Sequence, residues 1–319
     1  MRREFQDNGM QAPRPYYAIS DYYRGIFGKK IYKIPLSVAD TCPNRMGLKG
    51  MRTCAFCDEW GSAAYPDRAQ EGVARQLELN KARVLKRVNV SDFLAYFQAY
   101  TNSFAKLAIL EKQIDEALAV DGIRGVVVGT RPDCVSPAVM RLWQKTHERS
   151  WCSVELGVQS FFDHHLEFMA RGHSGQASID ALKRIAENTT VDVGIHLIFG
   201  NPGETDAEIV ETARLCNELP LKHVKLHHLH VLKGTELAER HARGEFHPVE
   251  FEIYAERVAL FLRHLRPEIA VQRLAALSNR PQELIAPDWT AKKFQVHEGI
   301  IGHMLRAGAR QGDLWRPAV

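Results

Sequence analysis

Short apolar runs alternate with amphipathic stretches along this chain, and the alternation predicts its secondary structure. Six runs are expected to be β-strands: residues 33–39, 93–98, 122–129, 152–159, 191–199 and 221–228. Apolar residues have helical spacing in the stretches between them, at 68–87, 106–119, 137–149, 177–187 and 206–219. Strands that alternate with helices favour βαβ units and a parallel sheet.

The number of these units sets the expected fold. Six units fall short of the eight in a closed barrel. We therefore expect an α/β fold, a partial (β/α)6 TIM-like barrel at residues 30–235, after an N-terminal segment at 1–29. Beyond it the pattern is mainly helical, at 249–265 and 294–307, with an irregular segment at 266–288. This C-terminal helical extension, 236–319, is expected to cap one side of the open barrel.

The later strands carry polar residues on one face, which changes the picture of the barrel interior. A parallel strand that is covered on both faces is nearly continuously apolar. In three predicted strands, alternate positions are instead polar or glycine: Ser153, Glu155, Gly157 and Gln159; Asp192, Gly194, His196 and Gly200; Lys225 and His227. One face therefore suits packing against helices, and the other suits a wet lumen that holds a ligand. Lys225 and His227 are candidates for binding substrate anions or moving protons.

Composition limits the compartment and the partners. No run approaches about 18 apolar residues, and the charged start of the chain lacks the apolar stretch of a signal peptide. We expect a cytoplasmic protein that does not contact a membrane. The net charge of +4 tolerates a polyanionic partner without requiring one. Basic residues gather at 81–87 and in the C-terminal region, where they form either a solvated face or a nucleic-acid contact: Arg263, Arg266, Arg273, Arg280, Lys292, Lys293, Arg306 and Arg310.

Three of the six cysteines lie in one loop after the first predicted strand: Cys42, Cys54 and Cys57. A C-x-x-C pair can bind one inorganic centre, and a third thiolate can come from the same loop. Structural zinc is almost always four-coordinate, yet the first histidine of the chain is His147. Three thiolates with one open metal position fit a [4Fe–4S] cluster better than a zinc site. An electron-transfer cluster and a fortuitous buried trio remain alternatives.

This loop resembles that of the radical S-adenosylmethionine (SAM) superfamily, in which an aromatic residue such as Phe56 usually precedes the third cysteine. Eleven residues separate Cys42 from Cys54, a spacing that resembles the YhcC-like subfamily, relatives of the Elongator catalytic subunit. Similar motifs continue over residues 16–290: Tyr-Phe-Gln-Ala-Tyr-Thr (96–101), Gly-Thr-Arg-Pro-Asp-Cys (129–134), Glu-Leu-Gly-Val-Gln (155–159), Arg-Gly-His (171–173), Gly-Asn-Pro-Gly-Glu (200–204) and Lys-Leu-His-His-Leu-His (225–230). The subfamily usually has proline at the position of His228.

The resemblance implies a [4Fe–4S] cluster and SAM, whose cleavage releases methionine and a 5′-deoxyadenosyl radical. It also implies cofactor contacts, with ordinary turn or barrel packing as the alternative at each position. Glu155 and Gln159 correspond to ribose-binding residues, and Arg171 to an arginine that pairs with the methionine carboxylate. The remaining cofactor candidates are the segment for the methionine amino group (Gln98, Tyr100, Thr101), the turn near adenine (Gly200, Pro202), and Arg131 and His196.

Catalytic candidates lie at the ends of the third and sixth strands, where barrel active sites form. Cys134 is a candidate hydrogen-atom donor or covalent nucleophile, and the alternative is a small buried thiol. Lys225 and His227 complete this set. Neighbouring residues of a strand face opposite ways, so His227 and His228 are not expected to converge on a second metal. Cys152 and Cys216 occupy helix-facing positions and are expected in the core.

The substrate is where the sequence is least informative. The resemblance suggests tRNA, because subfamily relatives modify the wobble uridine side chain, with an electron donor such as flavodoxin or ferredoxin. The chain has no acetyltransferase domain, which favours processing of an existing uridine substituent. A radical enzyme acting on a small molecule is one alternative, and a non-catalytic Fe–S nucleic-acid-binding protein is another.

Overall fold

The computed structural model describes residues 14–61, 63–277 and 280–317. The polar start of the chain, which argued against a signal peptide, falls mainly on residues 1–13, outside the described residues. No helix within the described ranges combines the length and the apolar character that a membrane span requires.

Seven parallel strands form one curled sheet in sequential order, which confirms the partial barrel. The strands are β1 (Ile31–Leu36), β2 (Asp92–Phe97), β3 (Ile123–Thr130), β4 (Trp151–Gln159), β5 (Asp192–Phe199), β6 (His223–His228) and β8 (Ala270–Val271). The first six match the predicted strands. The expectation of a wholly irregular segment at 266–288 is wrong at β8, where the N–H groups of Ala270 and Gln272 donate to Lys222, just before β6, and to Val224 on β6. It is also wrong at residues 281–286, which form a 3-10 turn and a short strand.

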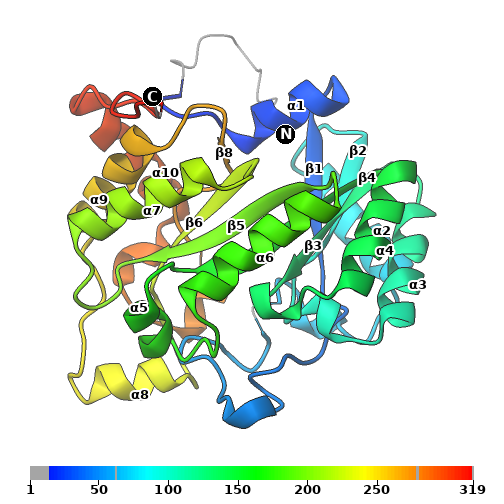
Figure 1. Ribbon diagram of the computed structural model, residues 1–319, viewed down its shortest axis with the longest axis horizontal. Coiled ribbons are helices and arrows are strands. Elements are labelled where there is room, and N and C mark those ends of the chain that lie inside the picture. Colours follow the sequence, from blue (N-terminus) through cyan, green and yellow to red (C-terminus); the bar gives the residue numbers. More distant parts are fainter. Residues whose placement is uncertain (1–13, 62, 278–279, 318–319) are drawn as a thin grey trace, which may run out of the picture.

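Helices cover the outer face of this sheet (Figure 1). They are α2 (Val73–Leu85), α3 (Leu107–Leu118), α4 (Pro137–Arg149), α6 (Gly175–Asn188) and α7 (Asp206–Glu218). Local sequence sets where they begin: the Ser136 side chain accepts from the N–H of Val139, and Pro137 needs no such partner. The main apolar core lies between these helices and the sheet, and it includes Cys152 and Cys216 as expected.

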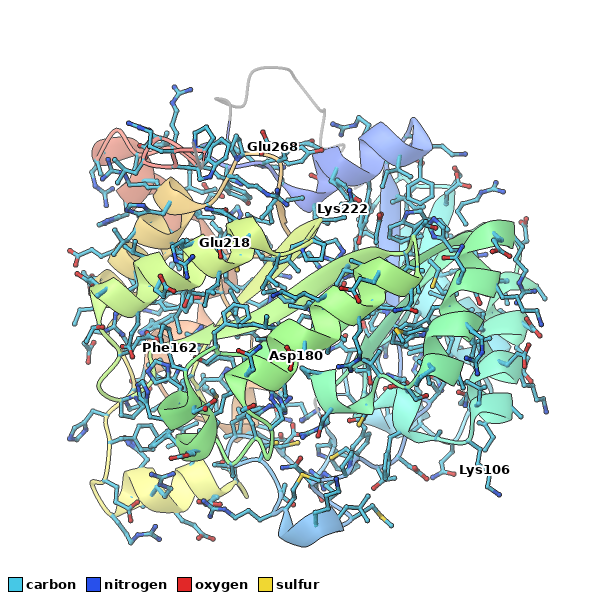
Figure 2. All side chains as sticks on the ribbon, in the orientation of Figure 1. Lys106, Phe162, Asp180, Glu218, Lys222 and Glu268 are labelled. Carbon is cyan, nitrogen blue, oxygen red and sulfur yellow. The ribbon has the colours of Figure 1, made fainter. Side chains whose placement is uncertain are left out.

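A helix that the sequence pattern did not predict, α1 (Ile19–Phe27), lies at the amino end of the barrel. Tyr23 on this helix packs with Ile31, Leu94 and Tyr96 in a separate apolar cluster. Tyr22 donates from its hydroxyl to Asp192 over 2.6 Å. The helix therefore covers the end of the barrel where the strands begin. In Figure 2, Lys222 and Glu268 lie toward this end, and Lys106, which follows β2, lies toward the opposite end.

The C-terminal extension is mainly helical, with α8 (Glu236–Ala242), α9 (Phe251–His264) and α10 (Lys293–Arg306). Helix α9 packs on α7, and α10 packs on α9. Two further strands, β7 (Val231–Leu232) and β9 (Leu284–Ala286), pair antiparallel. The remaining elements are α5 (Asp163–Phe168) and the 3-10 helices η1 (Leu48–Gly50), η2 (Pro66–Arg68), η3 (Asn102–Phe104), η4 (Pro132–Cys134), η5 (Pro281–Glu283) and η6 (Asp288–Ala291).

Candidate active site

The loop between β1 and α2 carries the three cysteines and is anchored at Ala55, between Cys54 and Cys57. The N–H of Ala55 donates to the carbonyl of Met169 over 2.9 Å, and its carbonyl accepts from the N–H of Leu237 over 2.9 Å. Ala55, Met169 and Leu237 also share an apolar cluster. The loop is thus fixed at the carboxyl end of the barrel, between α5 and α8 (Figure 1).

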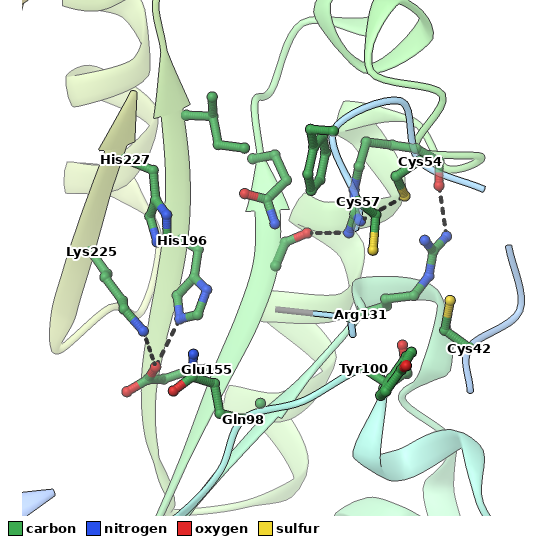
Figure 3. Close-up of a pocket in the computed structure, with 18 of the residues that line it drawn as sticks. Cys42, Cys54, Cys57, Gln98, Tyr100, Arg131, Glu155, His196, Lys225 and His227 are labelled. Carbon is green, nitrogen blue, oxygen red and sulfur yellow. Dashed lines mark hydrogen bonds and ion pairs between the residues drawn. The ribbon is translucent and has the colours of Figure 1, made fainter. Parts of the chain in front are cut away.

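The spacing of the three thiols bears on the metal that they could hold. Thiolates bound to one Zn²⁺ at about 2.3 Å would lie about 3.8 Å apart. Among the described residues, the one group of three ligand atoms within 4.8 Å of one another is His164, His165 and Glu208, not the cysteines. Figure 3 shows the three cysteines facing the same space. At least one pair of the three thiols is thus farther apart than two ligands of one zinc ion would be, so the trio is not a preformed zinc site.

Two arginines lie beside the thiols. Nη1 of Arg171 is 3.3 Å from Sγ of Cys54, and Nη2 of Arg45 is 3.6 Å from Sγ of Cys57. Burial raises the pKa of Cys57 to about 12, whereas the neighbouring Arg45 acts in the opposite direction. Arg45 therefore favours the thiolate form of Cys57, the form that a metal ligand requires, against the effect of burial.

A cavity begins at these thiols and continues into the barrel lumen, with about 1140 Å³ of empty volume counting its open mouth. Thirteen of the sixteen predicted site residues line it: Cys42, Cys54, Cys57, Gln98, Tyr100, Thr101, Arg131, Glu155, Gln159, Arg171, His196, Lys225 and His227. The polar strand faces therefore meet the cysteine loop in one space, as the alternation predicted.

Three predicted site residues are not part of this lining. Cys134 lies in η4, with Sγ 3.9 Å from a carboxylate oxygen of Asp133, and burial raises its pKa to about 12. Gly200 donates its N–H to Glu204 over 2.7 Å, and a Cβ there would lie 2.6 Å from the side chain of Val249. Gly200 thus faces the C-terminal extension. The roles expected for Cys134, Gly200 and Pro202 stay predictions.

Glu155 is the centre of a polar network in the lumen. Its side chain is fully buried and accepts from Lys33 over 2.5 Å and from His196 over 2.7 Å. Gln272 donates to it over 2.7 Å, and Lys225 lies 3.7 Å away. Burial raises the pKa of Glu155, but the two lysines outweigh burial and hold it well below its usual value. The carboxylate predicted to bind ribose thus has protein partners on both oxygens.

Two members of this network, Lys33 and Gln272, were not identified from the sequence. In β1, Lys33 lies on the face opposite to Ile34 and Leu36. The alternation argument applied to the later strands would therefore have placed Lys33 in the lumen. Gln272 directly follows the short strand β8, where no apolar alternation marks a face.

Arg131 holds the backbone of Arg171 in place. Its guanidinium forms two 2.8 Å hydrogen bonds with Asp133 and donates to the carbonyl of Arg171 over 2.7 Å. Arg171 in turn donates to the carbonyl of Gly157 over 2.7 Å. Its Nε is buried and has no partner among the described residues. The backbone and the guanidinium of Arg171 are thus both held, and its Nε is a donor nitrogen left for a ligand.

Two residues of the cavity have backbone conformations that L side chains rarely adopt. Tyr100 has φ of 54° and Gln159 has φ of 70°. Gly61 approaches Tyr100 so closely that an added Cβ would lie 2.3 Å from its ring. Left-handed conformations of non-glycine residues cost free energy and gather at functional sites. Here they aim Tyr100 and Gln159 into the cavity, which the surrounding packing must enforce.

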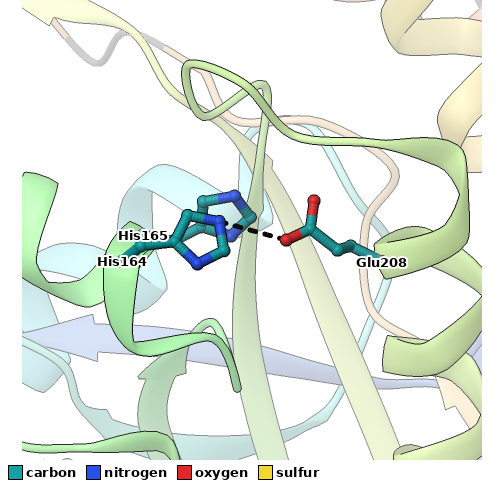
Figure 4. A group of neighbouring side chains, drawn as sticks. All are labelled: His164, His165 and Glu208. Carbon is teal, nitrogen blue, oxygen red and sulfur yellow. Dashed lines mark ion pairs between the residues drawn. The ribbon is translucent and has the colours of Figure 1, made fainter.

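The histidine pair on α5 lies outside the cavity. Nε2 of His164 is 3.0 Å from a carboxylate oxygen of Glu208, which ties α5 to the first turn of α7 (Figure 4). Glu208 also closes the capping box of α7 with Thr205. His165 is buried, and its Nδ1 lies 3.1 Å from the hydroxyl of Ser160, the residue after β4.

The fold and the cavity, together with matches to family models, identify the class of protein to which this chain belongs. A family model described as the Radical SAM superfamily matches residues 36–216, and one described as the Radical SAM C-terminal domain matches residues 221–306. The chain belongs to the radical SAM superfamily, and this membership implies a [4Fe–4S] cluster and SAM. The three thiols, the fixed Arg171 and the adjoining polar cavity fit both groups.

Within that class, the chain is 33% identical over 294 residues to Protein YhcC of Escherichia coli strain K12, across 91% of this chain and 93% of that protein. The tRNA uridine(34) acetyltransferase of Methanocaldococcus infernus is 33% identical over 188 residues, or 57% of this chain and 33% of that protein. The archaeal Methanocaldococcus infernus Elp3, with an N-terminal deletion, has the same fold, with a TM-score of 0.66 and 18% identity. The matched region covers 88% of this chain and 64% of that one.

Proposed function

We propose that this chain cleaves SAM reductively at a [4Fe–4S] cluster held by Cys42, Cys54 and Cys57, and that its substrate is tRNA. The observation that carries the first part is the placement of three thiols at one end of a polar, arginine-flanked cavity. The cluster, when bound, would supply the electron that breaks a C–S bond of SAM and releases a 5′-deoxyadenosyl radical. The protein supplies position and shielding.

The residues that line the cavity divide these tasks. Arg171 is placed to pair with the methionine carboxylate, because the carbonyl of Gly157 fixes its guanidinium beside Cys54 and Arg131 holds its backbone carbonyl. Gln98 and Thr101, at the end of β2, face the space expected for the methionine amino group. Helix α1 covers the opposite end of the barrel, which helps to exclude water from a reactive radical.

The second part of the proposal concerns an existing substituent on the wobble uridine of tRNA. The partial similarity to a tRNA uridine(34) acetyltransferase supports it. The basic residues of the C-terminal extension differ in their surroundings: some pair with carboxylates, and others are exposed. Arg263 pairs with Asp313, and Arg280 pairs with Glu283. Lys292 and Lys293 are exposed and directly follow η6, whose Thr290 contacts the cavity residue His228 over 2.7 Å.

The cluster part is tested on anaerobically reconstituted protein. The wild type should contain about four irons, and with dithionite it should convert SAM to 5′-deoxyadenosine. Cys54→Ala should lose both properties, whereas Cys216→Ala, a matched change of a cysteine in the helix-packed core, should keep iron and turnover. If the protein binds zinc in place of iron, or holds iron without producing 5′-deoxyadenosine, the proposal that it cleaves SAM at a [4Fe–4S] cluster is contradicted.

The tRNA part is tested in a deletion strain. Nucleosides from its bulk tRNA should lack or alter one uridine modification, detected by mass spectrometry, and the wild-type gene should restore it where the Cys54→Ala gene does not. Unchanged tRNA nucleosides, together with active cleavage of SAM, would favour a small-molecule substrate. We also propose a flavodoxin or ferredoxin as the electron donor. Replacing dithionite by reduced flavodoxin or ferredoxin should sustain cleavage.

A further inference from the structure

The wall of the cavity that faces the cysteines carries more basic than acidic side chains. In Figure 3, Lys225, His196 and His227 lie across the cavity from Cys42, Cys54 and Cys57. Glu155 is the carboxylate of this wall, and it is shared by Lys33 and Lys225. Burial lowers the pKa of His227 and of His196, so both imidazoles are neutral at pH 7 and add no charge.

Arg273 adds a third basic side chain to the same wall, after Lys33 and Lys225. It follows β8, and its Nη2 lies 2.6 Å from Nδ1 and 3.0 Å from Nε2 of His227, a neutral ring. Its Nε is buried without a hydrogen-bond partner, and no carboxylate of the described residues forms an ion pair with it. Burial lowers the pKa of Arg273 to about 10, so the guanidinium stays charged at neutral pH.

A second cavity of about 540 Å³ lies beside the first, and its lining includes Arg273, His227 and His230. Two carboxylates in this lining, Asp58 and Glu283, both pair with Arg280. Nδ1 of His230 is buried without a partner. The space next to Arg273 therefore offers several hydrogen-bond donors, whereas the carboxylates of Asp58 and Glu283 already pair with Arg280.

We propose that Arg273 and Lys225, with His227 and His230, bind an anionic group of the substrate, a carboxylate or a phosphate. A desolvated guanidinium without an ion-pair partner is costly, and an oxyanion would supply both the charge and the acceptors. Two donors of one arginine suit the paired oxygens of such a group. This subsite rests on the proposed function for its role. It would hold the substrate across the cavity from the cluster, away from the carboxylate of SAM.

The test uses protein purified anaerobically in chloride, at constant ionic strength. Inorganic phosphate and acetate are added separately, and thermal unfolding is followed. One or both anions should raise the melting temperature of the wild type, because a ligand that binds the folded state stabilises it. Arg273→Gln should lower the apparent affinity for the anion by about tenfold or more. Arg263→Gln, a control on α9 whose partner is Asp313, should respond like the wild type.

The responses to the two anions distinguish a phosphate group from a carboxylate as the bound group. A response to phosphate alone assigns a phosphate-bearing ligand, and a response to acetate alone assigns a carboxylate. No response to either, or an equal response of Arg273→Gln and the wild type, overturns the subsite. If Arg273→Gln does not fold, Lys225→Met is tested in its place. Lys225→Met should lose the response to the anion, and an intact response of this variant overturns the subsite. Cleavage of SAM is measured in parallel, so a wild type that binds anions but makes no 5′-deoxyadenosine disproves the proposed function alone.

Discussion

The guanidinium of Arg171 bridges the cysteine loop and strand β4. Its Nη1 lies 3.3 Å from Sγ of Cys54, and its Nη2 donates to the carbonyl of Gly157 over 2.7 Å. The side chain is buried, with 6% of its residue surface exposed. One side chain therefore couples a proposed cluster ligand to a strand that lines the cavity.

Replacing Arg171 by lysine should weaken SAM binding more than cluster binding. An ammonium group cannot span both contacts and also present a planar pair of donors to a carboxylate. We expect the apparent affinity for SAM to fall by about 10- to 100-fold, measured by equilibrium dialysis of the reconstituted protein. Iron content should stay near the wild-type value, because all three cysteines remain. Unchanged SAM affinity would assign Arg171 a purely structural role.

The close approach of Gly61 to Tyr100 offers a paired test. Gly61→Ala would place a Cβ 2.3 Å from the Tyr100 ring, whereas Gly28→Ala meets nothing within 4 Å, and both positions have positive φ. Gly28→Ala should therefore cost about 1 to 2 kcal/mol from the backbone alone. Gly61→Ala should cost more and should also reduce SAM cleavage. Equal activity of the two variants would show that the position of Tyr100 is irrelevant to the cofactor.

Buried histidines should make the protein sensitive to acid. Burial lowers the pKa of His165, His223 and His230 to about 4, and that of His196 to about 3. The unfolded chain binds more protons than the folded one below about pH 6.5, so stability falls as pH decreases from there toward 4. Each histidine contributes a slope of up to about 1.4 kcal/mol per pH unit.

Urea unfolding at pH 7 and pH 5 measures this dependence. The wild type should lose stability between the two values, and His223→Gln should lose less, because one buried titrating group is gone. The His223 ring is fully buried and contacts Ser153 and Gln272, which a glutamine can also reach. Equal losses in the two proteins would mean that His223 does not contribute.

The proposed tRNA substrate, together with the placement of basic residues on the extension, predicts a contact at Lys292 and Lys293. Lys292 and Lys293 follow the segment that contacts the cavity, whereas Arg310 adjoins Gln311, which bonds to Pro15 near the other end of the barrel. Lys292→Glu combined with Lys293→Glu should weaken tRNA binding several-fold and reduce its salt dependence. Arg310→Glu, an exposed control, should bind like the wild type. Equal effects would indicate non-specific attraction.

The sequence by itself determined the six main strands, the cysteine loop and the polar faces of β4, β5 and β6. These features are local: a strand alternates with a period of two, a helix repeats every 3.6 residues, and the three cysteines lie within sixteen positions. The match of helix α4 to its predicted bounds, with Pro137 in the first turn, has the same origin.

Only the tertiary structure decided which distant side chains meet. Lys33 contacts Gln272 across 239 positions, a pairing that no local pattern indicates. The aromatic face of α1 has a helical pattern too short to recognise, yet packing under the barrel stabilises it. Arg273, Cys134 and Gly200 likewise owe their surroundings to how the chain closes. Periodicity reports the face of an element, whereas long-range contacts depend on how all the elements pack together.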